Sequence, residues 1–158
     1  MKKIELITVG TLKEFYWKSA NEEYLKRLSK YCDIRITEVA ESRIQPNNTA
    51  ALIDKVLAEE STEIKRRLNN ATAILLDIQG KSYDSLGWAE LLRHYYEQPA
   101  SLAFIIGGSH GVSAEIKNIA AAKVSFSAMT FPHQLFRTMF LEQLYRGFRI
   151  LHNEPYHK

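Results

Sequence analysis

Two adjacent glycines, Gly107 and Gly108, directly follow an apolar stretch in the sequence FIIGGSHG. Glycine has no Cβ, so such a pair lets the main chain come close to a ligand. The loop is not a dinucleotide fingerprint, because the first glycine of G-x-G-x-x-G would fall on Ile106, and no acidic residue closes the next apolar run to hold a ribose. It is not a P-loop either, because no G-K-[ST] follows. For two glycines alone, a tight strand-to-helix turn is the simpler interpretation.

Two other loops are expected beside this one. LLDIQGKSYDS leaves a buried apolar run at Gly80, and SFSAMTFPHQ leaves another apolar run before a helix. The carboxyl ends of parallel strands meet at one edge of a sheet, where ligands bind. Three loops rich in main-chain donors and acceptors and poor in charge suit a flat neutral base such as adenine, each hydrogen bond contributing about 1 kcal/mol.

His133 and Arg137 are titratable side chains that come directly after the third loop. They are four residues apart at the start of the expected last helix and therefore share one of its faces. Such a pair either caps and solvates a helix or, beside a ligand, serves acid–base chemistry. None of the five histidines lies in H-E-x-x-H or pairs with a cysteine at zinc spacing, so no metal site is predicted.

The chain ends in EPYHK. A terminal segment of this kind is by default a frayed tail. An aromatic ring, an imidazole and a cation are also the groups that stack on an unpaired base and contact its phosphate. Both interpretations are open for Tyr156, His157 and Lys158.

Hydrophobic periodicity places these residues among alternating strands and helices. Short apolar or alternating runs predict strands over 4–9, 34–37, 72–78, 101–108 and 124–127, with the second at an edge of the sheet. Amphipathic repeats predict helices over 17–31, 50–69, 85–97, 114–122 and 132–152. The expected N-caps are Asn48 or Thr49, Ser85 and Ser113.

This alternation indicates an α/β fold, a largely parallel sheet with helices on both faces. A chain of 158 residues, 46% of them hydrophobic, is long enough for one core, so a single domain over 1–158 is expected.

Composition limits the partners and the compartment. The formal charge of +3 and the pI of about 8.9 permit nucleic acid without requiring it. The apolar runs are too short to cross a bilayer, and Glu5 interrupts the apolar N-terminal segment, which is untypical of a secretory leader. Cys32 is the only cysteine, so no internal disulfide can form. We expect a cytoplasmic protein with no membrane partner.

The expected last helix is apolar nearly all round, although a helix that covers only its own sheet needs one apolar face. The surplus predicts a homodimer through this helix. Glu142 and Arg146, four residues apart, are expected to form a helix-surface ion pair. The apolar residues are Leu135, Phe136, Met139, Phe140, Leu141, Leu144, Tyr145, Phe148 and Leu151.

Five segments together resemble a known family. LLDIQGK, FIIGGSHG, SFSAMTFPHQLFR, EQLYRGFRI and the terminal PYHK are similar, in order and along essentially the whole chain, to the ribosomal RNA large subunit methyltransferase H family of SPOUT methyltransferases. The resemblance implies a SPOUT-type α/β knot, whose C-terminal trefoil knot holds S-adenosylmethionine. It also implies a homodimer in which one subunit completes the cofactor pocket of the other. The implied activity is methylation of N3 of a pseudouridine in large-subunit (23S) ribosomal RNA, on the assembled ribosome.

The resemblance also implies roles for individual residues. His133, Arg137, Tyr156 and His157 are the catalytic candidates. Tyr156, His157 and Lys158 would bind RNA: Tyr156 would contact the base, His157 would polarise or deprotonate it, and Lys158 would contact a phosphate. Either His133 or His157 could assist proton removal. Relatives often carry Glu or Asn where this chain has His110, so we expect His110 to be a solvated loop residue. The cofactor would be bound by Leu76, Gly107, Gly108, Phe126, Ser127, Ala128, Met129, Thr130 and Phe131.

Two other classes of protein are alternatives. The glycine loop on a Rossmann-like sheet would suit a nucleotide-dependent oxidoreductase. The basic balance and the aromatic tail would suit a non-catalytic dimeric RNA-binding protein. Because no concentrated basic stripe is present, we expect an isolated stem-loop RNA to be a poor substrate compared with whole ribosomes.

Overall fold

The computed structural model describes residues 1–42 and 47–156. In that part of the chain the strands form one parallel sheet in the order β2-β1-β4-β3-β5. The strands are β1 (Lys3–Val9), β2 (Asp33–Val39), β3 (Thr72–Ser82), β4 (Leu102–Ile106) and β5 (Ala122–Ser125). As the sequence pattern predicts, β2 lies at an edge.

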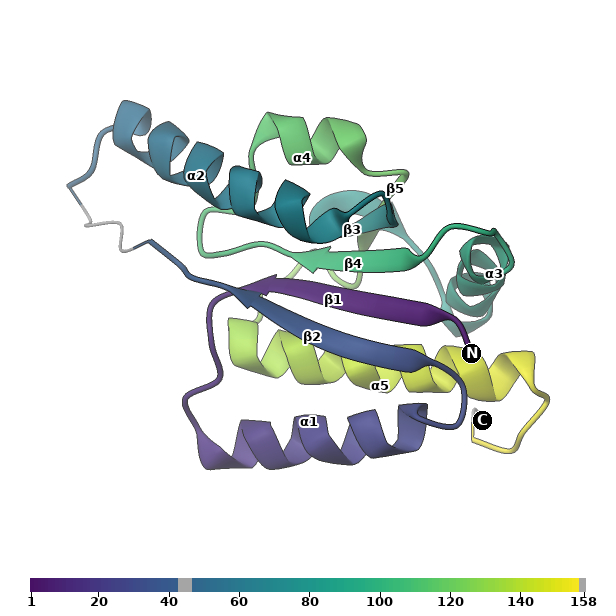
Figure 1. The fold of residues 1–158 in the computed structure, drawn as a ribbon. Coiled ribbons are helices and arrows are strands. Elements are labelled where there is room, and N and C mark those ends of the chain that lie inside the picture. Colours follow the sequence, from purple (N-terminus) through teal and green to yellow (C-terminus); the bar gives the residue numbers. More distant parts are fainter. Residues whose placement is uncertain (43–46, 157–158) are drawn as a thin grey trace.

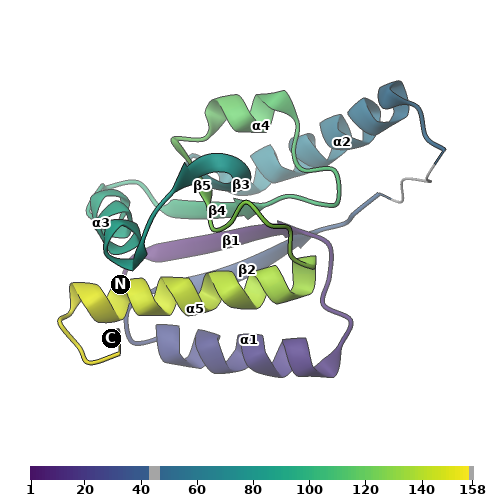
Figure 2. The ribbon, with the colours of Figure 1, turned by 180° about the vertical axis from the view of Figure 1, so that it is seen from behind.

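Helices cover both faces of this sheet, which confirms the predicted fold class (Figure 1; Figure 2). On one face lie α2 (Ala50–Leu68) and α4 (Ala114–Ile119), and on the other lie α1 (Phe15–Leu28), α3 (Ser85–Tyr96) and α5 (His133–Leu151). The threading of the C-terminal segment through a knot stays a prediction.

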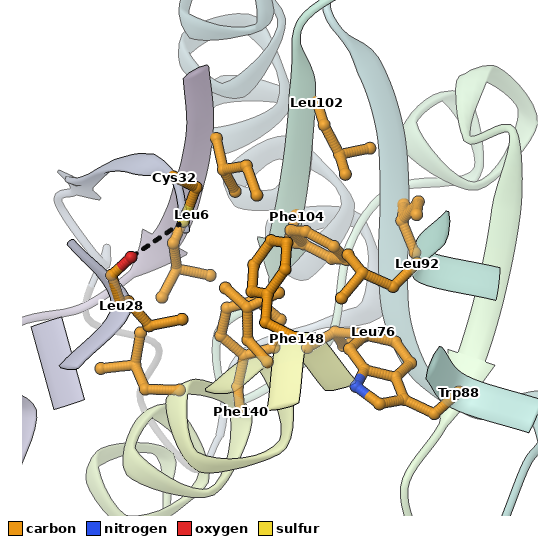
Figure 3. Close-up of a cluster of buried hydrophobic side chains, with 14 of the residues drawn as sticks. Leu6, Leu28, Cys32, Leu76, Trp88, Leu92, Leu102, Phe104, Phe140 and Phe148 are labelled. Carbon is orange, nitrogen blue, oxygen red and sulfur yellow. Dashed lines mark hydrogen bonds between the residues drawn. The ribbon is translucent and has the colours of Figure 1, made fainter. Parts of the chain in front are cut away.

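The core consists of two layers because successive strand residues point to opposite faces. Leu6 and Phe104 face α5, and their neighbours Ile7 and Ile105 face α2 and α4. Figure 3 shows the first layer, in which Phe104 lies among side chains from α3 and α5. This layer includes Leu6, Leu28, Leu76, Trp88, Leu92, Leu102, Phe104, Phe140, Leu144 and Phe148.

Strand β3 does not end near Ile78, as its apolar run predicts. It continues to Ser82, and both Leu76 and Lys81 pair with Val124 of β5, with an irregularity between them. Main-chain pairing with a strand 40 or so residues later carries β3 onward, and a local apolar count does not detect that pairing. The segment after Leu76 therefore bulges out of the ladder instead of forming the predicted strand-end loop at Gly80.

Local capping agrees with the sequence at two helices. The Thr49 side chain accepts a hydrogen bond from the Leu52 amide, and Ser113 accepts one from the Ile116 amide. At α3, however, the cap is Asp84 and not Ser85, because the Asp84 carboxylate accepts from the Gly87 amide at 2.7 Å.

Helix α5 packs against the sheet, α1 and α3, and it runs along one face of the sheet beside α1 (Figure 2). It begins beside the loops that follow the strands and ends beside the N-terminus of the chain, where the described C-terminal residues also lie (Figure 1). None of the helices in the described ranges has the length and apolarity needed to cross a membrane.

Candidate functional site

A cavity of about 250 Å³ opens where the chain leaves β4 and β5, beside the bulged segment of β3. The three predicted segments therefore do meet at one place. The residues that we expected here from the sequence and that line it are Leu76, Gly107, Gly108, Phe126, Ser127, Met129, Thr130, Phe131 and His133. The lining also includes Asp77, Ile78, Ile106, Ser109, Gly111, Val124 and Phe136.

Three of the predicted site residues are placed differently. Ala128 is in the third loop but not in the lining, and Arg137 lines a neighbouring cavity instead. Tyr156 packs on the second half of α5. The predictions for His157 and Lys158 lie outside the described part of the chain.

The glycine loop is folded tightly on itself. Gly108 and Gly111 form an isolated antiparallel bridge, and the Gly111 amide donates to the Gly108 carbonyl at 3.0 Å. A Cβ on Gly107 would lie 2.8 Å from the Gly111 carbonyl oxygen, closer than a methyl group can approach. Glycine is required at 107 because the loop's own main chain fills the space, and this leaves uncharged main chain along the cavity wall.

The third loop has an aromatic anchor. The Phe126 ring packs edge-on against Trp88 and also against Phe136, each at a centroid distance of 5.4 Å. Ser127 Oγ accepts a hydrogen bond from the Met129 amide at 2.9 Å, which turns the chain after the anchor. Met129 lines the cavity and remains 69% exposed. The loop is held at its beginning and presents an apolar side chain to solvent.

A second and larger cavity, of about 840 Å³, adjoins the first at the ends of β1 and β2. Ser109 and His133 line both cavities, so the imidazole at the start of α5 stands between them. Lys13, Glu41, His110 and Arg137 are among the charged or titratable side chains of this second cavity. His110 is exposed, in agreement with the prediction of a solvated loop residue.

Glu41 is a site residue that the sequence did not reveal. Its carboxylate accepts from both the amide and the hydroxyl of Ser109, at 2.8 and 2.7 Å. Partial burial acts to raise the pKa of Glu41, but the Ser109 hydrogen bonds and the nearby His133 and His110 outweigh it and lower that pKa. Glu41 is therefore ionised at neutral pH. A single acidic residue in a loop has no local signature that would have identified it.

Arg137 is buried, with 4% of its surface exposed, and its guanidinium is engaged by the protein. Nη1 donates to the Glu38 carboxylate at 2.7 Å and Nη2 to the Gly10 carbonyl at 3.2 Å. Its Nε has no partner among the described residues. The side chain thus joins α5 to the ends of β1 and β2, and does not reach into the first cavity.

Tyr156 folds back onto the second half of α5, from Glu142 onward. Its hydroxyl donates to Glu142 at 3.2 Å, and its ring lies 4.7 Å from the Arg146 guanidinium. Glu142 and Arg146 form the predicted ion pair at 2.5 Å. Burial, together with the Glu142 carboxylate, raises the pKa of Tyr156 to about 12. The phenol stays protonated at neutral pH, so it can donate a hydrogen bond or stack but not act as a base.

About half of α5 separates Tyr156 from the start of the helix beside the cavity of its own chain. The Tyr156 hydroxyl contacts Glu142, which is nine residues after His133, the first residue of α5. At about 1.5 Å per residue, this is about 14 Å along the helix axis. Within one protomer, Tyr156 is therefore displaced from the cavity along the helix.

Among the residues described, no three His, Cys, Asp or Glu side chains gather as a metal site would require. The residues that line the first cavity are mostly glycines and apolar residues, with three hydroxyl side chains, one carboxylate and one imidazole. Such a lining binds a largely neutral organic molecule by shape and directed hydrogen bonds.

The fold is that of a class of methyltransferases. A family model described as "Predicted SPOUT methyltransferase" matches residues 1–157, and the chain belongs to the SPOUT methyltransferase family. Two solved structures share the fold with a TM-score of 0.55 each. One, a probable methylase family protein from Haemophilus influenzae, is 11% identical, and the match covers 98% of this chain and 70% of that one. The other, a probable methyltransferase from Bordetella pertussis, is 13% identical over 92% of this chain and 96% of that one.

Within this class, the chain is similar to particular proteins. A Clostridium botulinum protein named ribosomal RNA large subunit methyltransferase H is 45% identical over 158 residues, which cover 98% of this chain and 99% of the relative. The Clostridium kluyveri protein of the same name is 45% identical over 157 residues, with the same coverage. The resemblance seen in the sequence motifs is confirmed.

Proposed function

We propose that this chain transfers a methyl group from S-adenosylmethionine to N3 of a pseudouridine in large-subunit (23S) ribosomal RNA, and that it acts on the assembled ribosome. The observation that carries the proposal is the single cavity formed by the bulge after Leu76, the glycine loop and the loop 126–131. The names of relatives at 45% identity support a large-subunit ribosomal RNA as the substrate.

The residues present fit this cofactor. Leu76, Phe126 and Phe136 offer apolar contacts for a nucleoside base, and the main chain of the glycine loop offers neutral donors and acceptors. Gly107 cannot carry a side chain without displacing the loop. The bound cofactor supplies a methyl carbon that its sulfonium already makes electrophilic. The protein must then align the nucleophile and help to remove its proton.

His133 is the candidate that this geometry favours for the proton. It lines both cavities, so a base in the larger cavity and a methyl donor in the smaller one would meet beside its imidazole. Histidine is the side chain that most often serves as a general acid or base in proteins. Arg137 supports this arrangement as a positioning residue, because its guanidinium fixes the first turn of α5 against Glu38 and Gly10.

A homodimer would bring the tail to the cavity. The residue that accepts a hydrogen bond from Tyr156, Glu142, lies about 14 Å along α5 from His133, and a partner whose α5 runs in the opposite direction would bring its Tyr156 to the cavity. The apolar surplus of α5 is weaker support than the sequence indicates, because α1 and α3 cover part of it. Exposed apolar side chains near the start of α5 provide a second argument: Phe15 is 81% exposed and Tyr16 60% exposed, and Gln134 accepts a hydrogen bond from the Lys13 amide just before them.

The test is incorporation of labelled methyl from S-adenosylmethionine. Purified protein is incubated with 70S ribosomes, free 50S subunits or the isolated stem-loop RNA, and the nucleosides are identified by mass spectrometry. We expect N3-methylpseudouridine, formed fastest on ribosomes. Binding of NAD but not S-adenosylmethionine in calorimetry would instead indicate an oxidoreductase. RNA binding without methyl incorporation would indicate a non-catalytic RNA-binding protein.

A further inference from the structure

The segment after β2 reaches across the end of β1 to the glycine loop. In the sheet, β1 lies between β2 and β4, so the loops after β2 and β4 are not direct neighbours. Glu41 nevertheless accepts two hydrogen bonds from Ser109, through one carboxylate oxygen, Oε1. This is a contact between residues 68 positions apart that main-chain pairing does not produce.

The carboxylate packs against two glycines, and a Cβ would crowd it only at Gly108. A Cβ on Gly108 would lie 2.9 Å from Oε1, and a Cβ on Gly10 would lie 3.6 Å from Oε2. The position of Gly10 is itself fixed, because its amide donates to the Val39 carbonyl at 2.8 Å at the end of β2. The ends of β1, β2 and β4 therefore converge on this one acidic group.

From this geometry we propose that Glu41 is a positioning residue for the cofactor loop. Its two hydrogen bonds with Ser109 hold the turn 107–111 in the shape that binds S-adenosylmethionine. The inference rests on the proposed function of the first cavity. Ser109 lines that cavity beside Gly108. The hydrogen bonds between Glu41 and Ser109 therefore fix the wall of the cavity, although Glu41 itself would not contact the cofactor.

The physical reason is preorganisation. A loop of glycines loses more conformational entropy on ordering than other sequences do, and a loop that is already held in its binding shape leaves less of that cost for the ligand. A hydrogen bond from a main-chain amide to an ionised carboxylate is stronger than one to a neutral acceptor. The nearby His110 and His133 favour the ionised form of Glu41.

The experiment measures the affinity and the KM for S-adenosylmethionine of the full-length protein and of Glu41→Ala, Glu41→Gln and Ser109→Ala. We expect Glu41→Ala to raise the Kd and the KM about three- to tenfold, with an unchanged kcat at saturating cofactor. Glu41→Gln keeps an acceptor without the charge and should fall between. Ser109→Ala loses one of the two hydrogen bonds and should have a smaller effect. Glu59→Gln, an exposed glutamate of α2, is the control for a loss of charge alone.

Hydrogen exchange provides a second measurement, because it reports directly on the Ser109 amide that binds Glu41. The Ser109 amide should exchange faster in Glu41→Ala and remain slow in Glu59→Gln. If the wild-type protein binds S-adenosylmethionine and the Kd of Glu41→Ala is within twofold of the wild-type value, the proposed role of Glu41 is wrong and the proposed function is unaffected. If the wild-type protein does not bind S-adenosylmethionine, the proposed cavity is wrong and this inference is overturned with it.

Discussion

Arg137 of α5 and Glu38 of β2 are 99 residues apart in the chain and form an ion pair of 2.7 Å. Arg137 is almost fully buried, whereas the Glu38 side chain keeps 39% of its surface exposed. The pair joins the start of the last helix to the edge strand of the sheet, and the second hydrogen bond of Arg137, to Gly10, adds the end of β1. The helix that carries His133 is thereby fixed in relation to two strand ends.

Replacing Arg137 should therefore lower the free energy of unfolding rather than remove a group that takes part in methyl transfer. In Arg137→Gln, the Gly10 carbonyl and Glu38 lose their donor, and we expect the free energy of unfolding to fall by about 1–3 kcal/mol. Arg27→Gln is the matched control. It breaks an exposed pair with Glu23, so we expect a much smaller loss of stability. Urea unfolding gives both values. An Arg137→Gln protein of normal stability that no longer transfers methyl would show instead that Arg137 acts in the reaction.

Gly80 lies where β3 passes close to the main chain of β5. A Cβ there would lie 2.6 Å from the carbonyl carbon of Lys123 and the amide nitrogen of Val124. These are main-chain atoms that cannot rotate away, so we expect Gly80→Ala to cost about 2 kcal/mol or more, or to prevent folding. Gly87→Ala in the first turn of α3 is the control, since a helical position favours alanine. Thermal unfolding compares them, and equal midpoints would show that β3 and β5 can separate locally.

Glu60 makes stability depend on pH. It is 6% exposed, and its Oε2 has no hydrogen-bond partner in the described part of the chain. Burial, reinforced by the Glu41 carboxylate, raises the pKa of Glu60 from 4.5 to about 7. A raised carboxyl pKa means that the folded state holds a proton which the unfolded chain releases. The stability is therefore complete below about pH 4.5 and is lost as the pH rises through about 7.

Glu60→Gln should remove this dependence. We expect the variant to match the wild type at pH 4.5 and to be more stable by about 1–3 kcal/mol at pH 8. Urea titrations at the two pH values measure the difference, and Glu59→Gln controls for the change of net charge. If the gain were the same at both pH values, the benefit would come from something other than the proton on Glu60.

In the proposed dimer, Tyr156 of one subunit completes the cavity of the other. Two inactive variants, one altered in each part, should therefore regain activity when they form mixed dimers. Tyr156→Ala and Gly107→Val should each abolish methyl transfer, the first without changing S-adenosylmethionine binding. When the two variants are refolded together, half of the dimers are mixed, and each mixed dimer has one intact pair of cavity and tail. The mixture should recover about a quarter of wild-type activity. Tyr156→Ala refolded with the double variant should recover nothing. Mixed dimers that form but stay inactive would contradict completion of the site by a partner.

Much of the fold could be predicted because it depends on local patterns. The apolar runs of β3 and β4 are continuous since both faces of these strands are covered, and the apolar surplus of α5 reflects its burial against the sheet, α1 and α3. The convergence of the glycine loop and the loop 126–131 followed from a general property of parallel sheets. The shared motifs indicated the family directly.

What the sequence by itself determined is thus the elements, the parallel sheet, the lining of the first cavity and the methyltransferase family. Only the tertiary structure decided that Arg137 pairs with Glu38, that Glu41 binds Ser109 and that Tyr156 packs on Glu142 and Arg146 of its own α5. These contacts depend on the strand order β2-β1-β4-β3-β5. Hydrophobic periodicity reports which face of an element is buried, but not which distant element lies next to it, and an isolated charge carries no periodic signal.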